Sequence, residues 1–285
     1  MSSSRTRAVH VSLTLSAAVA APPAPRPASA QARVFPQVAS FELPQASPRV
    51  HGIVGRLFSI RRGDSEFGSE PEAEVGIGEN FPVLALRRGD RPVTLGFGTQ
   101  VYGRFSLGDR KSALISNDWV VGLNTTADLG AWRLTGELYH ESSHLGDEYS
   151  DRFDAARVDW TREVAALWLT YGPGPLRVTG TVSYALIDEL DVERPAAGLA
   201  ADFEGRPIGR LFGGALRPMG GVFFEGAAAT SWRISTSAKL GLGLSRSPGG
   251  REIGIALIAH DGLSTQRQFF RRESRYIGGE LRFDL

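Results

Sequence analysis

A histidine and a serine stand two positions apart near the middle of the chain, at His140 and Ser142. In an extended strand, residues i and i+2 point to the same face with Cα atoms roughly 6.5 to 7 Å apart, so an imidazole can reach toward a hydroxyl. A serine hydroxyl is a weak nucleophile unless a base takes its proton. The pair therefore supplies the minimum chemistry for acyl transfer, a nucleophile and a general base.

Such a site also needs an acid that orients the imidazole. Asp159 and Glu163 belong to the next expected strand, whereas Asp147 and Glu148 lie in the intervening loop. All four are candidates on the sequence alone. The candidate catalytic set is the histidine, the serine and one of these acids.

Two other roles are open for this segment. Polar residues at a membrane rim can bind lipid headgroups without doing chemistry. His144 stands four residues after His140, which is a zinc spacing on a helix but about 13 Å in a strand, so a shared ion would require a bend. The acidic loop offers oxygen ligands, so calcium or magnesium bridging to lipopolysaccharide phosphates is a further candidate role. The candidate binding residues here are His144, Asp147 and Glu148.

Alternation with period two dominates the chain from about residue 50 to its end. Between Val93 and Phe105, for example, apolar residues occupy one parity and polar or glycine residues the other. This periodicity is typical of strands and excludes amphipathic helices. We expect twelve strands, at roughly 50–62, 72–88, 92–106, 114–128, 131–143, 157–171, 175–188, 207–217, 221–230, 232–246, 251–260 and 272–285.

The connections fall into two classes that alternate along the chain. Tight turns are expected at Arg88–Arg91, Asp128–Gly130, Gly172–Gly174, Pro218–Gly220 and Pro248–Gly250. Longer polar connections are expected around 63–71, 106–113, 144–156, 189–206 and 261–271, and the short link near Thr230 is the exception. In an antiparallel up-and-down barrel, every second connection lies at the same rim. The pattern therefore predicts an all-β barrel with short turns at one rim and long loops at the other.

The first 32 residues predict a cleaved signal peptide. Arg5 and Arg7 precede an apolar run from Ala8 to Ala21, and small residues up to Ala32 suit a signal peptidase. We expect cleavage after Ala32, an extended lead-in over residues 33–49, and the barrel over 50–285.

Composition excludes several classes of protein. The 285 residues are 42% hydrophobic and 22% charged, and they include no cysteine. Disulfide frameworks and four-thiolate zinc sites are therefore excluded. The balance of 32 basic against 31 acidic residues gives no excess for binding nucleic acid. The longest apolar runs are too short for a membrane-spanning helix, and no glycine-rich loop indicates a nucleotide site or another cofactor.

Alternation alone does not decide which face is inside, and a soluble sandwich or lipocalin-like barrel would also alternate. The export signal, the two classes of turn and the alternation that runs to Leu285 together favour a transmembrane β-barrel in the bacterial outer membrane. We expect the termini and tight turns to face the periplasm. The barrel-assembly machinery, acting on the C-terminal strand, and outer-membrane lipids or lipopolysaccharide are the expected partners.

In that arrangement the polar faces line the lumen. The inward candidates are Arg104, Arg133, Glu137, Arg177, Arg233, Lys239, Glu280 and Arg282. If the lumen is open, Arg104, Arg177, Arg233 and Lys239 predict a channel that favours anions. Opposed charges in a narrow lumen could instead pair and plug it. Lipid hydrolase, solute channel and structural or surface-interaction barrel thus remain three alternatives.

The segment Tyr139–Glu148 resembles the core of a family of outer-membrane barrel proteins known only as a domain of unknown function, with the pattern Tyr-His-x-Ser-Ser-His-Leu-Gly-Asp-Glu. The resemblance extends to Arg133–Leu138, His260–Gly262 and Gln268–Arg272. It implies an outer-membrane barrel and no particular activity.

The short His-x-Ser pattern is also similar to the core of outer-membrane lipid A deacylases, whose catalytic serine faces the outer leaflet. That resemblance implies that Ser142 and His140 face lipid. Those enzymes have an asparagine after the serine, and this chain has Ser143.

Overall fold

The computed structural model describes residues 31–36, 41–88, 91–108, 110–245 and 252–284. Most of the predicted signal peptide, the centres of the turns at 89–90 and 248–250, and the final Leu285 lie outside the described residues. Within them, no helix is both long and apolar enough to cross a bilayer.

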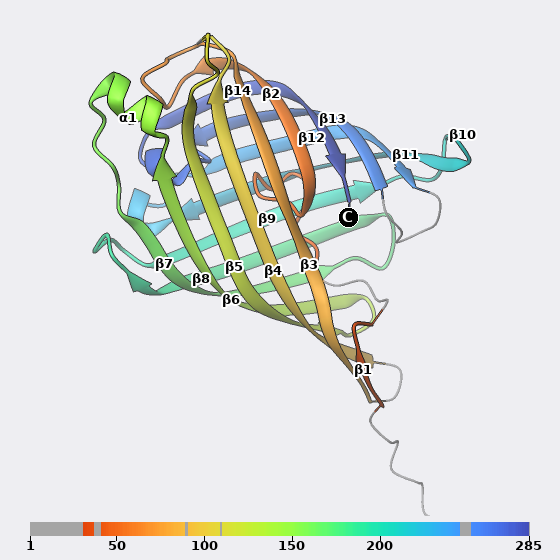
Figure 1. The fold of residues 1–285 in the computed structure, drawn as a ribbon. Coiled ribbons are helices and arrows are strands. Elements are labelled where there is room, and N and C mark those ends of the chain that lie inside the picture. Colours follow the sequence, from red (N-terminus) through yellow and green to blue (C-terminus); the bar gives the residue numbers. More distant parts are fainter. Residues whose placement is uncertain (1–30, 37–40, 89–90, 109, 246–251, 285) are drawn as a thin grey trace, which may run out of the picture.

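Twelve strands of the described chain form a closed antiparallel barrel (Figure 1). Each pairs with the strands before and after it, and β14 closes the ring by pairing with β2. The strands are β2 (Gly52–Arg62), β3 (Glu72–Arg88), β4 (Arg91–Ser106), β5 (Leu114–Asp128), β6 (Trp132–Leu145), β7 (Trp160–Tyr171), β8 (Leu176–Asp188), β9 (Pro195–Glu204), β11 (Gly214–Ala227), β12 (Ser235–Ser245), β13 (Glu252–Leu263) and β14 (Glu273–Phe283).

The predicted number of twelve strands is confirmed, but the strands predicted at 207–217 and 221–230 were wrong. Residues 195–204, expected within a loop, form β9, whose many alanines give little contrast between its faces. The expected strands 207–217 and 221–230 are largely one strand, β11, and Pro218 lies inside it rather than in a turn. Because β9 pairs with β11 only from Met219 onward, Pro218 lies beyond the end of that neighbour.

Short helices and strands lie at both rims of the barrel. At one rim lie the helix α1 (Asp147–Phe153), inside the loop predicted at 144–156, and the 3₁₀ turns η1 (Ala228–Thr230) and η2 (Arg267–Phe269). At the other end β1 (Gln31–Val34) pairs with β3, and β10 (Gly209–Leu211) forms a hairpin with β11. Figure 1 shows α1 at one end of the ring and β1 and β10 at the other. When β9 is included, the short link near Thr230 lies at the same rim as the long loops. Successive strands therefore alternate in direction around the whole barrel.

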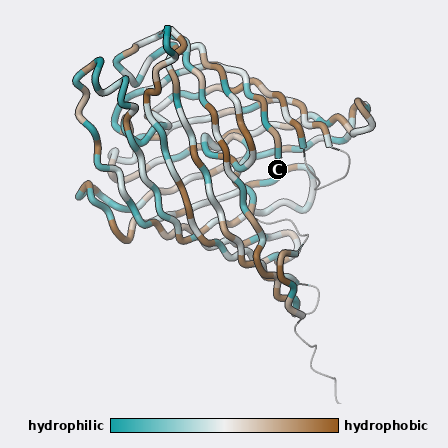
Figure 2. The backbone as a smooth tube through the Cα atoms, viewed as in Figure 1, coloured by the Kyte–Doolittle hydropathy of each residue, from teal (hydrophilic) through white to brown (hydrophobic). Residues whose placement is uncertain are grey.

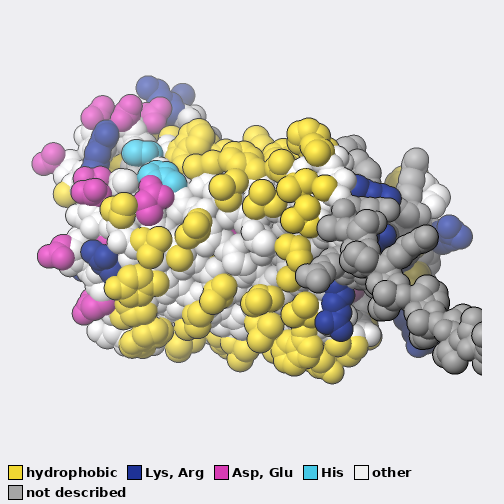
Figure 3. Space-filling model, turned by 90° about the horizontal axis from the view of Figure 1, so that it is seen from below, with side chains coloured by type: hydrophobic (Ala, Val, Ile, Leu, Met, Phe, Trp, Pro, Cys, Tyr) yellow, Lys and Arg dark blue, Asp and Glu magenta, His cyan; other side chains and the backbone are white. Residues whose placement is uncertain are grey.

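The outward face of the barrel is apolar and the inward face is charged. Leu257 is 68% exposed on the outside, whereas Glu280 is 3% exposed inside. Figure 2 shows hydrophobic and hydrophilic residues alternating along the strands, and Figure 3 shows apolar side chains over the wall with charged side chains toward its two ends. A soluble barrel would have the opposite arrangement, since leucine is stable outside only against lipid. The protein is therefore a barrel of the bacterial outer membrane. Following the expected topology, we call the rim that carries α1 and the long loops the outer rim.

The charges inside the barrel pair with one another. Arg56 donates to Glu74 at 2.7 Å and to Glu280 at 2.8 Å, and Lys239 forms a close ion pair with Glu280. The guanidinium carbon of Arg104 lies 4.2 Å from the ring centroid of Phe58, and its Nε lies 3.4 Å from Glu72. Such pairing offsets the cost of removing charges from bulk water.

Residues 41–50, which are the second described part of the lead-in together with Val50, lie inside the ring, whereas Arg33 and Val34 belong to β1 at the rim opposite α1. The backbone carbonyl of Phe41 accepts a hydrogen bond from Asn80, and Val50 N donates to the Tyr102 hydroxyl at 2.7 Å. These contacts reach β3 and β4, and Gln45 N donates to Asp202 of β9 at 3.1 Å on another part of the wall. This segment, which we call the lumen plug (residues 41–50), therefore bridges the inside of the barrel.

The occupied lumen generates a prediction about conductance. In planar bilayers the full protein should show no steady open channel, because the plug crosses the lumen and the paired charges narrow it. A variant lacking residues 41–49 should conduct, provided that it migrates as a heat-modifiable barrel. Steady porin-like conductance of the full protein would contradict the plugged arrangement.

His51, which directly follows the plug, generates a prediction about pH. Burial, with the charge of Arg282, lowers the pKa of His51 from its ordinary value near 6.5 to about 4. Between these values the unfolded chain binds a proton that the folded barrel does not, so stability should fall as the pH falls from about 6.5 to about 4. The temperature at which the heat-modifiable form is lost, measured across this range, should fall less steeply for His51→Gln. If this temperature falls equally steeply with pH in both proteins, the predicted role of His51 is wrong.

Candidate functional site

The two faces of β6 carry different chemistry. His140, Ser142 and His144 share the outward parity of the exposed Leu138, as the alternation predicts, whereas Glu141 and Ser143 are buried on the inward face. His140 and Ser142 lie near the end of β6 that leads into α1. The pair therefore faces the lipid close to the outer rim.

Glu163 is the acid that meets the histidine. It lies directly opposite His140 in the register of β6 and β7, and its Oε1 is 2.8 Å from His140 Nδ1. If the Nδ1 proton is donated to this carboxylate, Nε2 is left free to accept a proton. Of the four acids considered from the sequence, Glu163 is the one that contacts His140.

The other predicted acids have different partners. Asp159 precedes β7 and accepts a hydrogen bond from the Thr161 hydroxyl at 3.4 Å. Asp147 receives Arg157 at 2.8 Å, and Glu148 lies beside it in the first turn of α1. Across the described ranges, no three histidine or acidic side chains converge as metal ligands would, so the geometry gives the predicted calcium or magnesium role no support.

Ser142 lies between two neighbouring strands. It is half-buried, opposite Trp119 of β5 on one side and Thr161 of β7 on the other. Trp119 Nε1 donates to Asn117 Oδ1 at 2.7 Å on the same outward surface. Among the described residues, no hydrogen bond involves the Ser142 hydroxyl, so the structure joins His140 to Glu163 but not Ser142 to His140.

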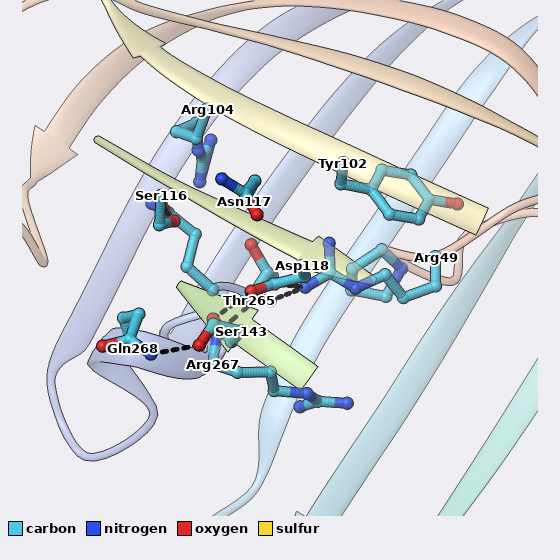
Figure 4. A network of polar contacts seen from close by, with 12 residues as sticks. Arg49, Tyr102, Arg104, Ser116, Asn117, Asp118, Ser143, Thr265, Arg267 and Gln268 are labelled. Atoms are coloured by element: carbon cyan, nitrogen blue, oxygen red, sulfur yellow. Dashed lines mark hydrogen bonds and ion pairs between the residues drawn. The ribbon is translucent and has the colours of Figure 1, made fainter. Parts of the chain in front are cut away.

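The inward side of the same strand segment is held by a polar network (Figure 4). Glu141 accepts hydrogen bonds from Arg267 at 2.7 Å and from Trp160 at 3.0 Å. The Ser143 hydroxyl donates to Asp118, and Gln268 donates to the Ser143 carbonyl at 2.8 Å. The outer loop that contains η2 is thereby fastened to β6 directly behind His140 and Ser142.

Asp118 joins this network to the lumen plug. Arg49 of the plug donates to the Asp118 carboxylate and also to the Thr265 carbonyl, the latter at 2.6 Å. Asp118 is fully buried, and so is its partner Ser143. Sequence reasoning identified neither residue as functional, although the Gln268–Arg272 segment had been singled out by resemblance.

The four predicted channel cations are not brought together. Arg104 and Lys239 are buried in ion pairs with lumen carboxylates. Arg177 contacts Glu42 at 3.1 Å, and Arg233 pairs with Glu273 at the outer rim, outside β12. Each of the four has a carboxylate partner, so the geometry does not support an anion-selective lining. His144 is exposed at the rim and remains a candidate headgroup ligand.

Several solved structures of other barrels are similar to this chain at low sequence identity. A structure titled KdgM porin is 12% identical, with 81% of this chain and 98% of that chain covered and a TM-score of 0.43. LpxR from Salmonella typhimurium is 11% identical, with coverages of 82% and 100% and a TM-score of 0.41. The β domain of the Bordetella autotransporter BrkA is 13% identical, with coverages of 82% and 99% and a TM-score of 0.37.

No curated protein matches the chain. A family model matches residues 36–285, which include the whole barrel and the lumen plug. Its description is "Protein of unknown function (DUF1207)". The chain belongs to the DUF1207 family.

Proposed function

We propose that this barrel hydrolyses an acyl ester of an outer-leaflet lipid, with Ser142 as nucleophile, His140 as general base and Glu163 as the orienting acid. The observation that carries the proposal is the 2.8 Å contact between His140 Nδ1 and Glu163 on the lipid-facing wall. A histidine held by a carboxylate on one nitrogen and free on the other is the arrangement that general-base catalysis needs.

The proposed reaction has two halves. Ser142 Oγ attacks the ester carbonyl while His140 Nε2 takes its proton, and the resulting imidazolium gives that proton to the departing alcohol oxygen. Water then attacks the acyl-serine with His140 again as base, releasing the fatty acid and restoring the serine. Glu163 holds the imidazole and stabilises its charged form, and it does not itself need to be protonated.

The position of the pair suits a lipid substrate. Lipid esters lie at the boundary between headgroups and hydrocarbon, and a residue near the outer end of a barrel strand meets that boundary. The membrane would therefore present the ester to Ser142 by lateral diffusion, without a deep pocket. Binding of two reactants in a fixed orientation is itself a large part of catalysis.

Stabilisation of the oxyanion must differ from that in the lipid A deacylases. Ser143, which follows the nucleophile, faces the lumen and donates to Asp118, so it does not reach the outer surface. The Thr161 hydroxyl lies directly across the strand pair from Ser142. We assign it as the candidate oxyanion donor: its proton, which is directed at Asp159 over 3.4 Å in this structure, would turn to the developing charge, where a hydrogen-bond donor lowers the barrier.

The hydrolase proposal is tested by fatty-acid release from lipopolysaccharide and from phospholipid in detergent. Ser142→Ala and His140→Ala should each lose about a thousandfold or more in rate, and Glu163→Gln about a hundredfold or more. Every variant must first migrate as a heat-modifiable barrel. The proposal falls if the parent protein releases no fatty acid, or if the variants release as much as it does.

The two adjacent serines provide a matched test of the two faces of β6. Ser143→Ala removes a buried hydrogen bond to Asp118 and should lower stability by about 1–2 kcal/mol. Ser142→Ala removes no hydrogen bond and should leave the temperature of heat modification nearly unchanged. Activity should show the reverse order, with Ser143→Ala retaining most of it. Equal effects of the two substitutions on both readouts would disprove this division of roles.

A further inference from the structure

A groove on the lipid-facing wall begins directly below the His140–Glu163 pair. Its volume is about 690 Å³, and its outward lining is largely aliphatic, with one tyrosine and one threonine. The outward lining residues are Leu95, Leu123, Thr125, Gly136, Leu138, Ala165, Leu167, Val182 and Tyr184. In Figure 3 the wall that carries the exposed histidines shows large apolar side chains bordering a paler area without them.

Strand register fixes the groove relative to the pair. Ala165 follows Glu163 at the next outward position of β7, and it lies opposite Leu138, the next outward position below His140. Gly136 is one further step along β6 and lies opposite Leu167. At about 3.3 Å per residue, Gly136 is roughly 13 Å along the strand from His140. The groove therefore leads from the pair toward the middle of the membrane.

Small residues create the depression. Gly136 and Ala165 have little or no side chain, whereas Leu138 and Leu167 beside them project outward. A Cβ added at Gly136 would meet Leu167 Cδ2 at 3.7 Å, an ordinary contact, so the backbone does not require glycine there. A larger apolar residue would be equally stable on the lipid-facing wall. With glycine at this position, the space that such a side chain would fill is open to a ligand.

We propose that this groove holds one acyl chain of the lipid whose ester carbonyl lies at Ser142, so that the protein acts on a long-chain acyl ester. The inference rests on the proposed hydrolase. Its occupant is a lipid chain because the groove opens on the hydrocarbon core. The outer-leaflet half of that core is roughly 15 Å thick. Because barrel strands tilt by about 40°, Gly136 lies about 10 Å deeper than the pair, within that half.

Chain and groove are both already in an apolar medium, so the gain comes from packing and positioning rather than from the hydrophobic effect. A chain held in the groove fixes the ester carbonyl at Ser142, whereas a short chain leaves it free to move. The groove should therefore appear as a preference for long chains in kcat/KM, without an absolute requirement for them.

The experiment compares Gly136→Leu, which fills the groove, with Gly180→Leu as a matched control. Gly180 is on the outward face of β8, it is not among the residues that line the groove, and a Cβ there meets nothing within 4 Å. Phospholipids with long and with short acyl chains are hydrolysed in the same mixed micelles. Gly136→Leu should lower the ratio of long-chain to short-chain kcat/KM about three- to tenfold, the size expected for lost positioning contacts, and Gly180→Leu should leave the ratio unchanged.

A second readout does not depend on hydrolysis. Ser142→Ala protein in phospholipid vesicles is crosslinked to a lipid with a diazirine in its acyl chain, and the modified residues are mapped. Adducts should concentrate on Leu138 and Leu167, disappear when Gly136→Leu is added, and persist with Gly180→Leu. Adducts spread evenly over the apolar wall would overturn the inference.

The two proposals fail separately. If adducts concentrate in the groove but the parent protein releases no fatty acid, the hydrolase is wrong and the groove remains a lipid-chain site. If fatty acid is released but the chain-length ratio is the same for both glycine variants, the hydrolase stands and the groove is not its acyl subsite.

Discussion

Pairing of charges inside a closed ring is the constraint on which the structure depends. The barrel places leucines in lipid and so must turn its charged residues inward, where each needs a partner or bears the cost of desolvation. Arg56 forms ion pairs with two carboxylates, and Arg49 of the plug forms the ion pair that Asp118 requires. The lumen plug is therefore part of the charge balance of the barrel, which follows from the same requirement that keeps the wall apolar.

The same alternation gives β6 two independent surfaces. Glu141 and Ser143 are tied to η2 and Asp118 on the inside, while His140 and Ser142 face the membrane. Because hydrogen bonds on its inward face hold β6 in place, the strand keeps His140 and Ser142 in position without using their own hydrogen-bonding groups. In the proposed hydrolase, the inward residues therefore hold β6 in position, and the catalytic roles belong only to the groups on the lipid side.

Much of this could be predicted from the sequence because a barrel strand has a strict period of two. Parity alone predicted that His140 and Ser142 face outward. The total of twelve strands was also predicted, because missing β9 offset the division of β11 into two strands. Parity fails where side chains carry no contrast, as in the alanine-rich β9. The turn signal at Pro218 is misleading for another reason, since Pro218 lies in β11 beyond the end of β9. The pairing of His140 with Glu163 rather than Asp159 depends on cross-strand register, which a single sequence does not encode locally.

Long-range contacts of the plug were the least predictable feature. Arg49 and Asp118 are 69 residues apart, and Arg49 and Thr265 are 216 apart, so no local periodicity joins them. Their convergence nevertheless bears on function. An open channel requires a continuous polar path, and a chain segment fixed at several points across the ring obstructs it, with a cavity of about 210 Å³ beside the segment. A lipid-facing site needs no such path, because its substrate arrives from the bilayer. The arrangement that argues against transport through the lumen is therefore fully compatible with chemistry on the outer wall.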